Sequence, residues 1–354
     1  MKPKTAKRLI AAAIIAAVLT TALILRRPSV PEYEVTDLGL LMQFGHVNAI
    51  NNKGQVVGWT QDPNGQSHAF IWNPVDGKKL IPLPDRRSSV ANDINDKGQV
   101  VGELFFTGGK RSAFVWDQET GITELGTLGG DSSVASAINN NGQVTGWIEN
   151  SEGKTRAFIW DKTNGMQDLG TLGEAESIAH DINDKGQVVG RSFLSNGQIC
   201  GQIHGFIWDQ DNGMVDIGAL RPIPYAHAQA INNSGQVVGT STKKSSDCGF
   251  IWQKSKGMKE LKLPGQSASP TKINDSGQVI GYFETREFLF FKSHKSYFLW
   301  DPEQGTIELD DISQSRGWFE AHDINNKGQI IGTQFSKPGE GQDHIIILTP
   351  KAKQ

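Results

Sequence analysis

The chain has 354 residues, of which 37% are hydrophobic and 21% are charged, and its formal net charge is −3. This composition supplies a large apolar core and excludes an intrinsically disordered protein. Two cysteines exclude a disulfide-dense scaffold and a four-cysteine zinc site, while forty glycines and fourteen prolines favour tight turns over long helices.

The amino-terminal segment predicts export. Residues 9–25 are seventeen uncharged, mostly apolar residues with basic residues on both sides. As a helix this run is about 25 Å long, near the shortest membrane span and slightly longer than a usual signal-peptide core. Two interpretations fit this segment, a signal peptide that is cleaved and an anchor that stays in the inner membrane. The apolar run continues up to Leu25, which favours the anchor. More cations precede the run than follow it, so we expect residues 28–354 on the periplasmic or extracellular side.

The rest of the chain is acidic. The first 27 residues contain six cations and no acids, which leaves a net charge of −9 on the other residues. A nucleic-acid backbone requires a basic face, so this balance argues against a nucleic-acid partner.

Seven copies of one unit follow the amino-terminal segment. Each copy has the form Ile-Asn-(Asn/Asp)-x-Gly-Gln-(Val/Ile)-x-Gly, and the copies begin at positions 50, 94, 138, 182, 231, 273 and 324. Successive copies are 44, 44, 44, 49, 42 and 51 residues apart. This period is typical of a four-stranded propeller blade and is too long for one rung of a solenoid.

Each unit has the pattern of four short strands. The first strand ends in Ile-Asn, and a turn whose glycine permits positive φ joins it to the second. The third strand, such as HAFIW at 68–72, is apolar on both faces, which is typical of a sheet packed between two neighbours. An Asp-x-x-x-Gly turn and a fourth strand that ends in Leu-Gly or Ile-Gly complete several of the units.

The last unit has only three strands in this pattern. Residues 33–39 match the fourth strand but precede the first unit. We therefore predict that they pair beside residues 344–348, which closes the ring and leaves no open sheet edge. The expected organisation is a signal or anchor helix at 1–27, a linker at 28–32, an all-β seven-bladed propeller at 33–350 and a tail at 351–354.

These motifs resemble the HAF repeats, a family of bacterial extracellular repeats with a His-Ala-Phe signature. His68-Ala69-Phe70 matches the signature, ELGTLGG at 124–130 and DLGTLG at 168–173 are further matches, and the resemblance spans about residues 33–348. It implies export and a repeat architecture but no defined reaction. The other units replace the histidine or the alanine, so we interpret the triplet as structural. The strands are also similar to kelch repeats, without their paired glycines.

No motif predicts a catalytic residue, a cofactor or a metal site. The string DINDKG at 93–98 resembles a calcium loop, but its fifth position is Lys97, where the ion requires an oxygen. The histidines lack metal-ligand spacing, and no nucleophile elbow, phosphate loop or dinucleotide fingerprint occurs.

If the first strand is innermost, the residue two positions before the repeated isoleucine lines the central channel. This predicted channel ring consists of Asn48, Asn92, Ser136, His180, Gln229, Thr271 and His322. Two histidines on one ring suit a ligand or a metal, and solvated channel residues are the alternative. Asp93, Asp181 and Asp323 stand one position later, but acids repeated across blades are better explained by the blade itself than by an active site.

The two cysteines, Cys200 and Cys248, precede the third strands of adjacent units. In an oxidising compartment a disulfide between them would join the fourth and fifth blades. Two free thiols are the alternative.

The loops between strands two and three, and between strand four and the next unit, vary most among the units. Strand direction places both sets on one face, which we expect to carry binding. Its richest stretches are residues 282–297 and 313–320. The candidate aromatic and arginine anchors are Arg286, Phe288, Phe290, Phe291, Trp318 and Phe319, with Arg221 and Tyr225 on corresponding loops. Burial in the sixth blade is the alternative for residues 288–291.

These observations favour an exported, non-catalytic module that binds an envelope protein or a glycan, with residues 9–25 in the membrane if they are retained. The alternative is a secreted propeller hydrolase or lyase that acts on carbohydrate with acids from several blades. A third possibility is an architectural repeat protein. Converging carboxylates in a deep channel favour the enzyme, and a shallow aromatic face favours binding.

Overall fold

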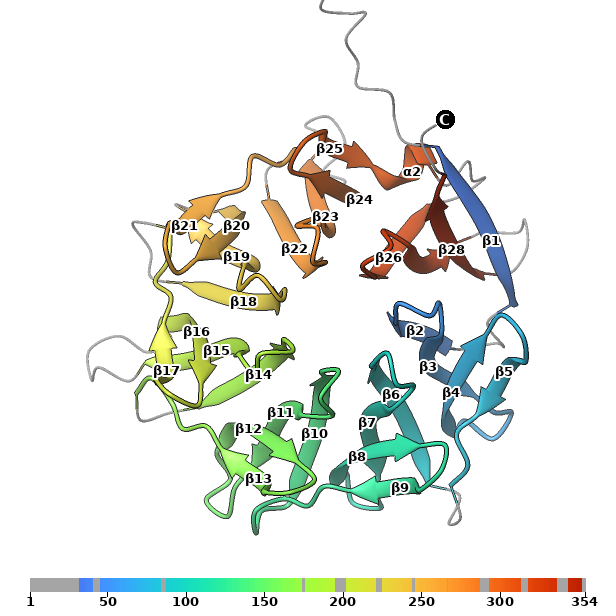
Figure 1. Ribbon diagram of the computed structural model, residues 1–354, viewed down its shortest axis with the longest axis vertical. Coiled ribbons are helices and arrows are strands. Elements are labelled where there is room, and N and C mark those ends of the chain that lie inside the picture. The colour runs from blue at the N-terminus through green and yellow to red at the C-terminus, as the bar shows by residue number, and fades with distance from the viewer. Residues whose placement is uncertain are drawn as a thin grey trace, which may run out of the picture.

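The protein is known from a computed structural model that describes residues 32–40, 45–83, 87–173, 176–194, 202–220, 225–243, 246–265, 267–286, 293–312, 318–335 and 343–351. These residues form seven four-stranded antiparallel sheets arranged around a central axis (Figure 1). The all-β, seven-bladed propeller predicted from the repeats is confirmed.

The strands of each blade run from the axis to the rim in chain order (Figure 1). Blade 1 contains β2 (Gly45–Ile50), β3 (Val56–Gln61), β4 (Ser67–Asn73) and β5 (Gly77–Leu80), and blade 2 contains β6 (Ser88–Ile94), β7 (Val100–Phe105), β8 (Arg111–Asp117) and β9 (Gly121–Glu124). Blade 3 contains β10 (Ser132–Ile138), β11 (Val144–Glu149), β12 (Thr155–Asp161) and β13 (Gly165–Asp168), and blade 4 contains β14 (Ser177–Ile182), β15 (Val188–Leu194), β16 (Gln202–Asp209) and β17 (Gly213–Asp216). Blade 5 contains β18 (Ala226–Ile231), β19 (Val237–Lys243), β20 (Ser246–Gln253) and β21 (Gly257–Glu260), and blade 6 contains β22 (Ser267–Ile273), β23 (Val279–Arg286), β24 (Ser293–Asp301) and β25 (Gly305–Glu308).

Blade 7 combines both ends of the propeller. It contains β26 (Phe319–Ile324), β27 (Ile330–Gln334), β28 (His344–Pro350) and, as the outermost strand, β1 (Tyr33–Leu40). The strands β1 and β28 are antiparallel, with Tyr33 opposite Pro350 and Leu40 opposite His344, and lie side by side in Figure 1. Tyr33 is buried in the core that blades 6 and 7 share, so this pairing ties residues at opposite ends of the propeller together.

Residues 1–31, which include the predicted export segment, lie outside the described residues. A four-residue helix, α2 (Leu309–Ile312), follows blade 6. Within the described part of the chain, no helix is long and apolar enough to cross a membrane.

A β-bulge in the first strand and a glycine in the second recur in every blade. In blade 1 the register shifts between Val47 and Ala49, next to Gly58 on β3. A side-chain carbon at Gly58 would lie 2.0 Å from the carbonyl oxygen of His46, so only glycine fits there. The glycine of the repeated Gln-Val-Val-Gly segment is therefore required by the close approach of the bulged strand.

Deletion of residues 31–41 is expected to lower the melting temperature by roughly 5–10 °C. The deletion removes β1 and exposes the edge of β28, which lowers the free energy of unfolding by several kcal/mol. In a chain of this size each kcal/mol lowers the melting temperature by about 2 °C. Thermal unfolding followed by circular dichroism checks this, with a deletion of residues 1–30 as the control. Equal melting temperatures for the two deletions would show that β1 does not stabilise the ring.

Candidate functional site

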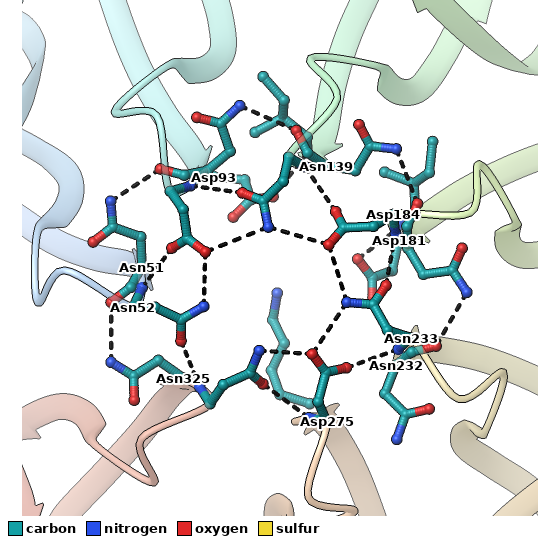
Figure 2. A pocket seen from close by; sticks show the side chains of 18 of the residues that line it. Asn51, Asn52, Asp93, Asn139, Asp181, Asp184, Asn232, Asn233, Asp275 and Asn325 are labelled. Atoms are coloured by element: carbon teal, nitrogen blue, oxygen red, sulfur yellow. Dashed lines mark hydrogen bonds between the residues drawn. The ribbon is translucent and has the colours of Figure 1, made fainter.

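The innermost strands bring three layers of polar side chains to one end of the central channel. The bulged residue of each first strand lies two positions before the repeated isoleucine, and the Asn-(Asn/Asp) pair follows the isoleucine. Successive residues of this segment therefore project toward the axis or toward the neighbouring blade. Figure 2 shows the resulting set of hydrogen bonds.

The first layer is a closed ring of buried asparagines, one per blade. Its members are Asn51, Asn95, Asn139, Asn183, Asn232, Asn274 and Asn325, each 3–4% exposed. The side-chain amide of each donates to the backbone carbonyl of the corresponding asparagine in the next blade, at 2.9–3.1 Å. The last of these bonds joins Asn325 to Asn51 and so connects blade 7 to blade 1.

Each ring asparagine also organises its own turn. Asn139 donates to Gln143 Oε1 at 2.9 Å, and its Oδ1 accepts from the amides of Asn141 and Gln143 at 3.0 and 2.9 Å. With the bond to the Asn183 carbonyl, one buried side chain makes four hydrogen bonds. This explains why every repeat has asparagine after the isoleucine.

The second layer alternates asparagine with aspartate. Its members, one residue further along, are Asn52, Asp96, Asn140, Asp184, Asn233, Asp275 and Asn326. The backbone amide of each donates to a side-chain oxygen of the next, at 2.8–2.9 Å, around the whole ring. Side-chain amides donate to the flanking carboxylates, as Asn233 does to Asp184 and Asp275 at 3.0 and 3.1 Å (Figure 2). Because seven is odd, the alternation breaks once, where Asn326 meets Asn52.

The third layer contains the acids that stand just before the isoleucine. Asp93 accepts from the amide of its own Ile94 and from that of Ile138 in the next blade, both at 2.8 Å. Asp181 and Asp323 bridge their own blades to blades 5 and 1 in the same way. Both oxygens of each carboxylate are thus bonded to the backbone, and the acids act as clamps between blades.

Lys272 occupies this third-layer position in blade 6. Burial raises the pKa of Asp93 to about 7 and also raises the pKa values of Asp181 and Asp323, whereas Lys272 favours their charged forms. Burial opposes the charge of Lys272, but attraction to the three carboxylates prevails and raises its pKa. The cluster therefore has one permanent cation for three acids.

The three layers surround a small polar cavity. Its volume is about 170 Å³, and its lining includes Asp93, Asp181, Lys272 and Asp323. Asp275 and Asn326, which also line it, are exposed to solvent, so the cavity opens on the face that carries the repeated turns. This volume is below the 300–1,000 Å³ of typical ligand pockets and suits only a small molecule.

The predicted channel ring lies on the innermost strands, but none of its seven residues lines this cavity. Three of them reach the next blade: Asn48 donates to the Ala91 carbonyl, Asn92 to that of Ala135, and His180 Nδ1 bonds to that of Ala228, at 2.7–2.9 Å. Thr271 bonds to the Ile280 carbonyl within its blade. Ser136 and Gln229 are half-buried.

The two predicted channel histidines lie on the innermost strands of different blades, β14 and β26. His322 packs against His46 with ring centroids 4.1 Å apart and bonds to Thr333 Oγ1 at 3.0 Å. Burial lowers the pKa of His322 to about 3 and that of His180 to about 4. Within the described residues no group of three or more His, Cys, Asp or Glu side chains is arranged to hold a metal ion.

The predicted binding residues are expected on the variable-loop face, which is formed by the loops between strands two and three and between strand four and the next blade. Those that the structure describes differ in exposure. Trp318 is 48% exposed, whereas Phe319 is fully buried in the core of blades 6 and 7, so the prediction that Phe319 contacts a partner is corrected by its packing. Tyr225 stacks on His227 with ring centroids 4.9 Å apart. Arg286 ends β23, but the position of its side chain, like Arg221, Phe288, Phe290 and Phe291, lies outside the described residues.

An aromatic patch surrounds Trp318 on this face. The indole stacks on Phe335, with ring centroids 5.2 Å apart and an angle of 14° between the planes. Two residues along the chain, Glu320 bonds to the Tyr297 hydroxyl at 2.5 Å and lies 3.8 Å from the Lys295 ammonium. That ammonium lies 3.9 Å from the centre of the Tyr282 ring. The patch thus combines stacked rings with one fixed pair of opposite charges.

Two larger cavities lie between blades on the opposite face, among the repeated turns. They have volumes of about 830 and 760 Å³ and lie between blades 1 and 2 and between blades 2 and 3. Trp116 lines the first and Trp160 the second, at equivalent positions of the repeat. Comparison of loop lengths does not predict these grooves, because their turns scarcely vary.

Cys248 is half-buried on β20, and burial raises the pKa of its thiol. Cys200 lies outside the described residues. A disulfide between them therefore stays a prediction.

Comparisons with known proteins place the chain by fold. A family model described as a protein of unknown function (DUF3466) matches residues 75–172, which span the end of blade 1, blade 2 and blade 3. The chain is similar to that family over these residues. No curated protein sequence matches it significantly.

Several solved propellers are similar in structure. The propeller domain of the Trilobed protease from Pyrococcus furiosus has a TM-score of 0.59 at 15% identity, with 88% of this chain and 95% of that one covered. Virginiamycin B lyase from Staphylococcus aureus has a TM-score of 0.57 at 13% identity, with 90% and 100% covered. Acylaminoacyl peptidase from Pyrococcus horikoshii has a TM-score of 0.54 at 14% identity, with 85% of this chain and 51% of that one covered. At these identities the likeness establishes the propeller fold alone.

Asn139→Ala is expected to lower the free energy of unfolding by roughly 3 kcal/mol. It removes four hydrogen bonds of a buried side chain and leaves partners in two blades unsatisfied. Urea unfolding measures the loss, with the exposed Asn64→Ala as the matched control. A loss below about 1 kcal/mol would contradict a stabilising role for the ring.

Asp93→Asn is expected to change how stability depends on pH. Burial raises the pKa of Asp93 from its ordinary 3.8 to about 7, so the folded chain holds a proton that the unfolded chain releases between these values. Asp93 therefore costs stability as the pH rises from about 4 to about 7, and the cost is constant above that window.

Denaturant unfolding across this pH range tests the effect. The stability of the native chain relative to the Asp93→Asn variant should fall up to about pH 7. The comparison with the variant removes the contributions of groups that do not interact with Asp93, such as the histidines. Asp76→Asn is the control, because Lys79 lowers the pKa of that exposed carboxylate and no such fall is expected. A difference that does not vary with pH would refute the assignment to Asp93.

Proposed function

We propose that this propeller is a non-catalytic binding module at the cell envelope that holds a protein or glycan partner on its variable-loop face. The observation that carries the proposal is the exposed Trp318 indole stacked on Phe335. A large aromatic side chain held rigid at the surface is a common binding anchor, because little conformational entropy is lost when a partner covers it.

The surroundings of Trp318 support this role. Glu320, two residues along the chain from Trp318, pairs with Lys295, and the Lys295 ammonium lies over the half-buried Tyr282 ring. Tyr297 is buried and supports Glu320 from the core through its hydroxyl. Such a mixture of aromatic surface and fixed polar groups suits a glycan or a peptide segment. The segment at 287–292, which joins β23 to β24, carries the other aromatic candidates, Phe288, Phe290 and Phe291.

Export belongs to the same proposal. The apolar run at 9–25 with its flanking cations is the supporting feature, and it brings the propeller to the periplasmic or extracellular side either free or anchored to the inner membrane.

A second candidate is hydrolysis or elimination on a carbohydrate, with channel acids as the catalytic groups. One observation favours it: Asp93 lies in a cavity with two other acids, and its pKa is raised to about 7, which suits a general acid. The backbone bonds of all three carboxylates favour the structural role instead.

Trp318→Ala is expected to reduce partner recovery at least tenfold without a change in melting temperature. The tagged full-length chain is used to capture partners from an envelope preparation, and bound protein and glycan are quantified by mass spectrometry and sugar analysis. Phe106→Ala is the matched control, because Phe106 is 38% exposed on the same face of blade 2. Equal recovery by both variants would exclude the patch. Turnover of a carbohydrate by the native chain, lost in Asp93→Asn, would favour the enzyme.

A further inference from the structure

Six of the seven isoleucine amides that face the channel are capped by carboxylates of the chain. Three acids suffice because each caps two amides, one in its own blade and one in the next, at 2.8–2.9 Å. The capped pairs are blades 2 and 3, blades 4 and 5, and blades 7 and 1. Blade 6 is left over because the number of blades is odd.

Blade 6 has a different arrangement at this position. The preceding blade carries Ala230 where an acid would have to stand to reach the Ile273 amide, and blade 6 itself carries Lys272. No side-chain oxygen of the described residues accepts from the Ile273 amide, and the Lys272 ammonium has no hydrogen bond or ion pair with them. Both residues line the channel cavity. An ammonium and a backbone amide are thus directed at the same small polar space.

We propose that this end of the channel binds a small amino-acid zwitterion, whose carboxylate pairs with Lys272 and accepts from the Ile273 amide. The carboxylate takes the part that an aspartate oxygen plays in the other six blades. Charge-assisted bonds from an ammonium and a backbone amide are strong ones for such a group.

The acids that line the cavity favour a ligand that carries an ammonium as well as a carboxylate. The cavity lining contains one ammonium and six carboxylates, which give it a formal excess of negative charge that repels a simple anion. The six acids are Asp93, Asp96, Asp181, Asp184, Asp275 and Asp323. A ligand ammonium placed toward Asp93, Asp181 and Asp323 offsets this repulsion. Lys272 stays charged at neutral pH because the three acids raise its pKa against the effect of burial.

The cavity limits the size of the ligand. Its volume of about 170 Å³ is close to that of an engineered 150 Å³ cavity that holds benzene, a molecule of six carbon atoms. Glycine, alanine and β-alanine have about this number of non-hydrogen atoms. The exposed Asp275 and Asn326 mark the side from which such a ligand enters. This site is separate from the Trp318 patch, and its occupation does not depend on the proposed function.

Calorimetric titration of the full-length chain tests the proposal with β-alanine and glycine as probes. Propionate, which lacks the ammonium, and propylamine, which lacks the carboxylate, are the matched controls. We expect at least one zwitterion to bind at least tenfold more tightly than either control. Absence of binding by both zwitterions, or equal binding by propionate, would overturn the proposal.

Two variants locate the binding. Lys272→Met is expected to weaken it at least tenfold, whereas Lys272→Arg retains it in part. Ala230→Asp supplies the missing carboxylate from the preceding blade and is expected to abolish binding, and a cooperative thermal unfolding transition of this variant shows that the chain is folded. Binding unchanged in Ala230→Asp and Lys272→Met would place the ligand elsewhere. Trp318→Ala leaves this binding intact, so failure here is distinct from failure of the binding module.

Discussion

The structure depends on hydrogen bonds that cross from one blade to the next around the channel. A propeller blade is a small sheet with little stability of its own, and the ring holds together only if each blade is fixed to both neighbours. The buried asparagines, such as Asn139, meet this need in each of the seven blades through a bond to the next carbonyl. Since both partners are buried, loss of either one leaves a costly unsatisfied group.

The odd number of blades shapes the rest of the channel. Alternation of asparagine and aspartate places an amide donor between every two carboxylates, which avoids repulsion between neighbouring acids. Seven positions cannot alternate completely, so Asn326 meets Asn52 where the first and last blades join. The same parity leaves Ile273 without a carboxylate cap and places Lys272 beside it. The two exceptions in the channel thus follow from one geometric constraint.

The repeat spacing was enough to predict the propeller. A unit of about 44 residues with four apolar segments matches a four-stranded blade and is too long for one rung of a solenoid. The channel lining was harder to predict. Strict alternation points the residue two before the isoleucine, such as Asn48, toward the axis, but the bulge adds a residue and brings Asp93 to the cavity instead. Alignment of the seven units shows Lys272 as the only cation at its position, a signal that motif searches ignore. Burial of single aromatic residues was also hard to predict. Trp318 and Phe319 are adjacent in sequence, but successive side chains of an extended chain point to opposite sides, so Trp318 is exposed and Phe319 is buried.

Native-state hydrogen exchange of the seven inward-facing isoleucine amides tests the account most directly. If carboxylate clamps between blades hold the ring, the amides of six of these residues exchange only through global unfolding, and that of Ile273 exchanges at least tenfold faster. The six are Ile50, Ile94, Ile138, Ile182, Ile231 and Ile324. Equal exchange at all seven, or exchange of the capped amides as fast as exposed turn amides, would contradict the account.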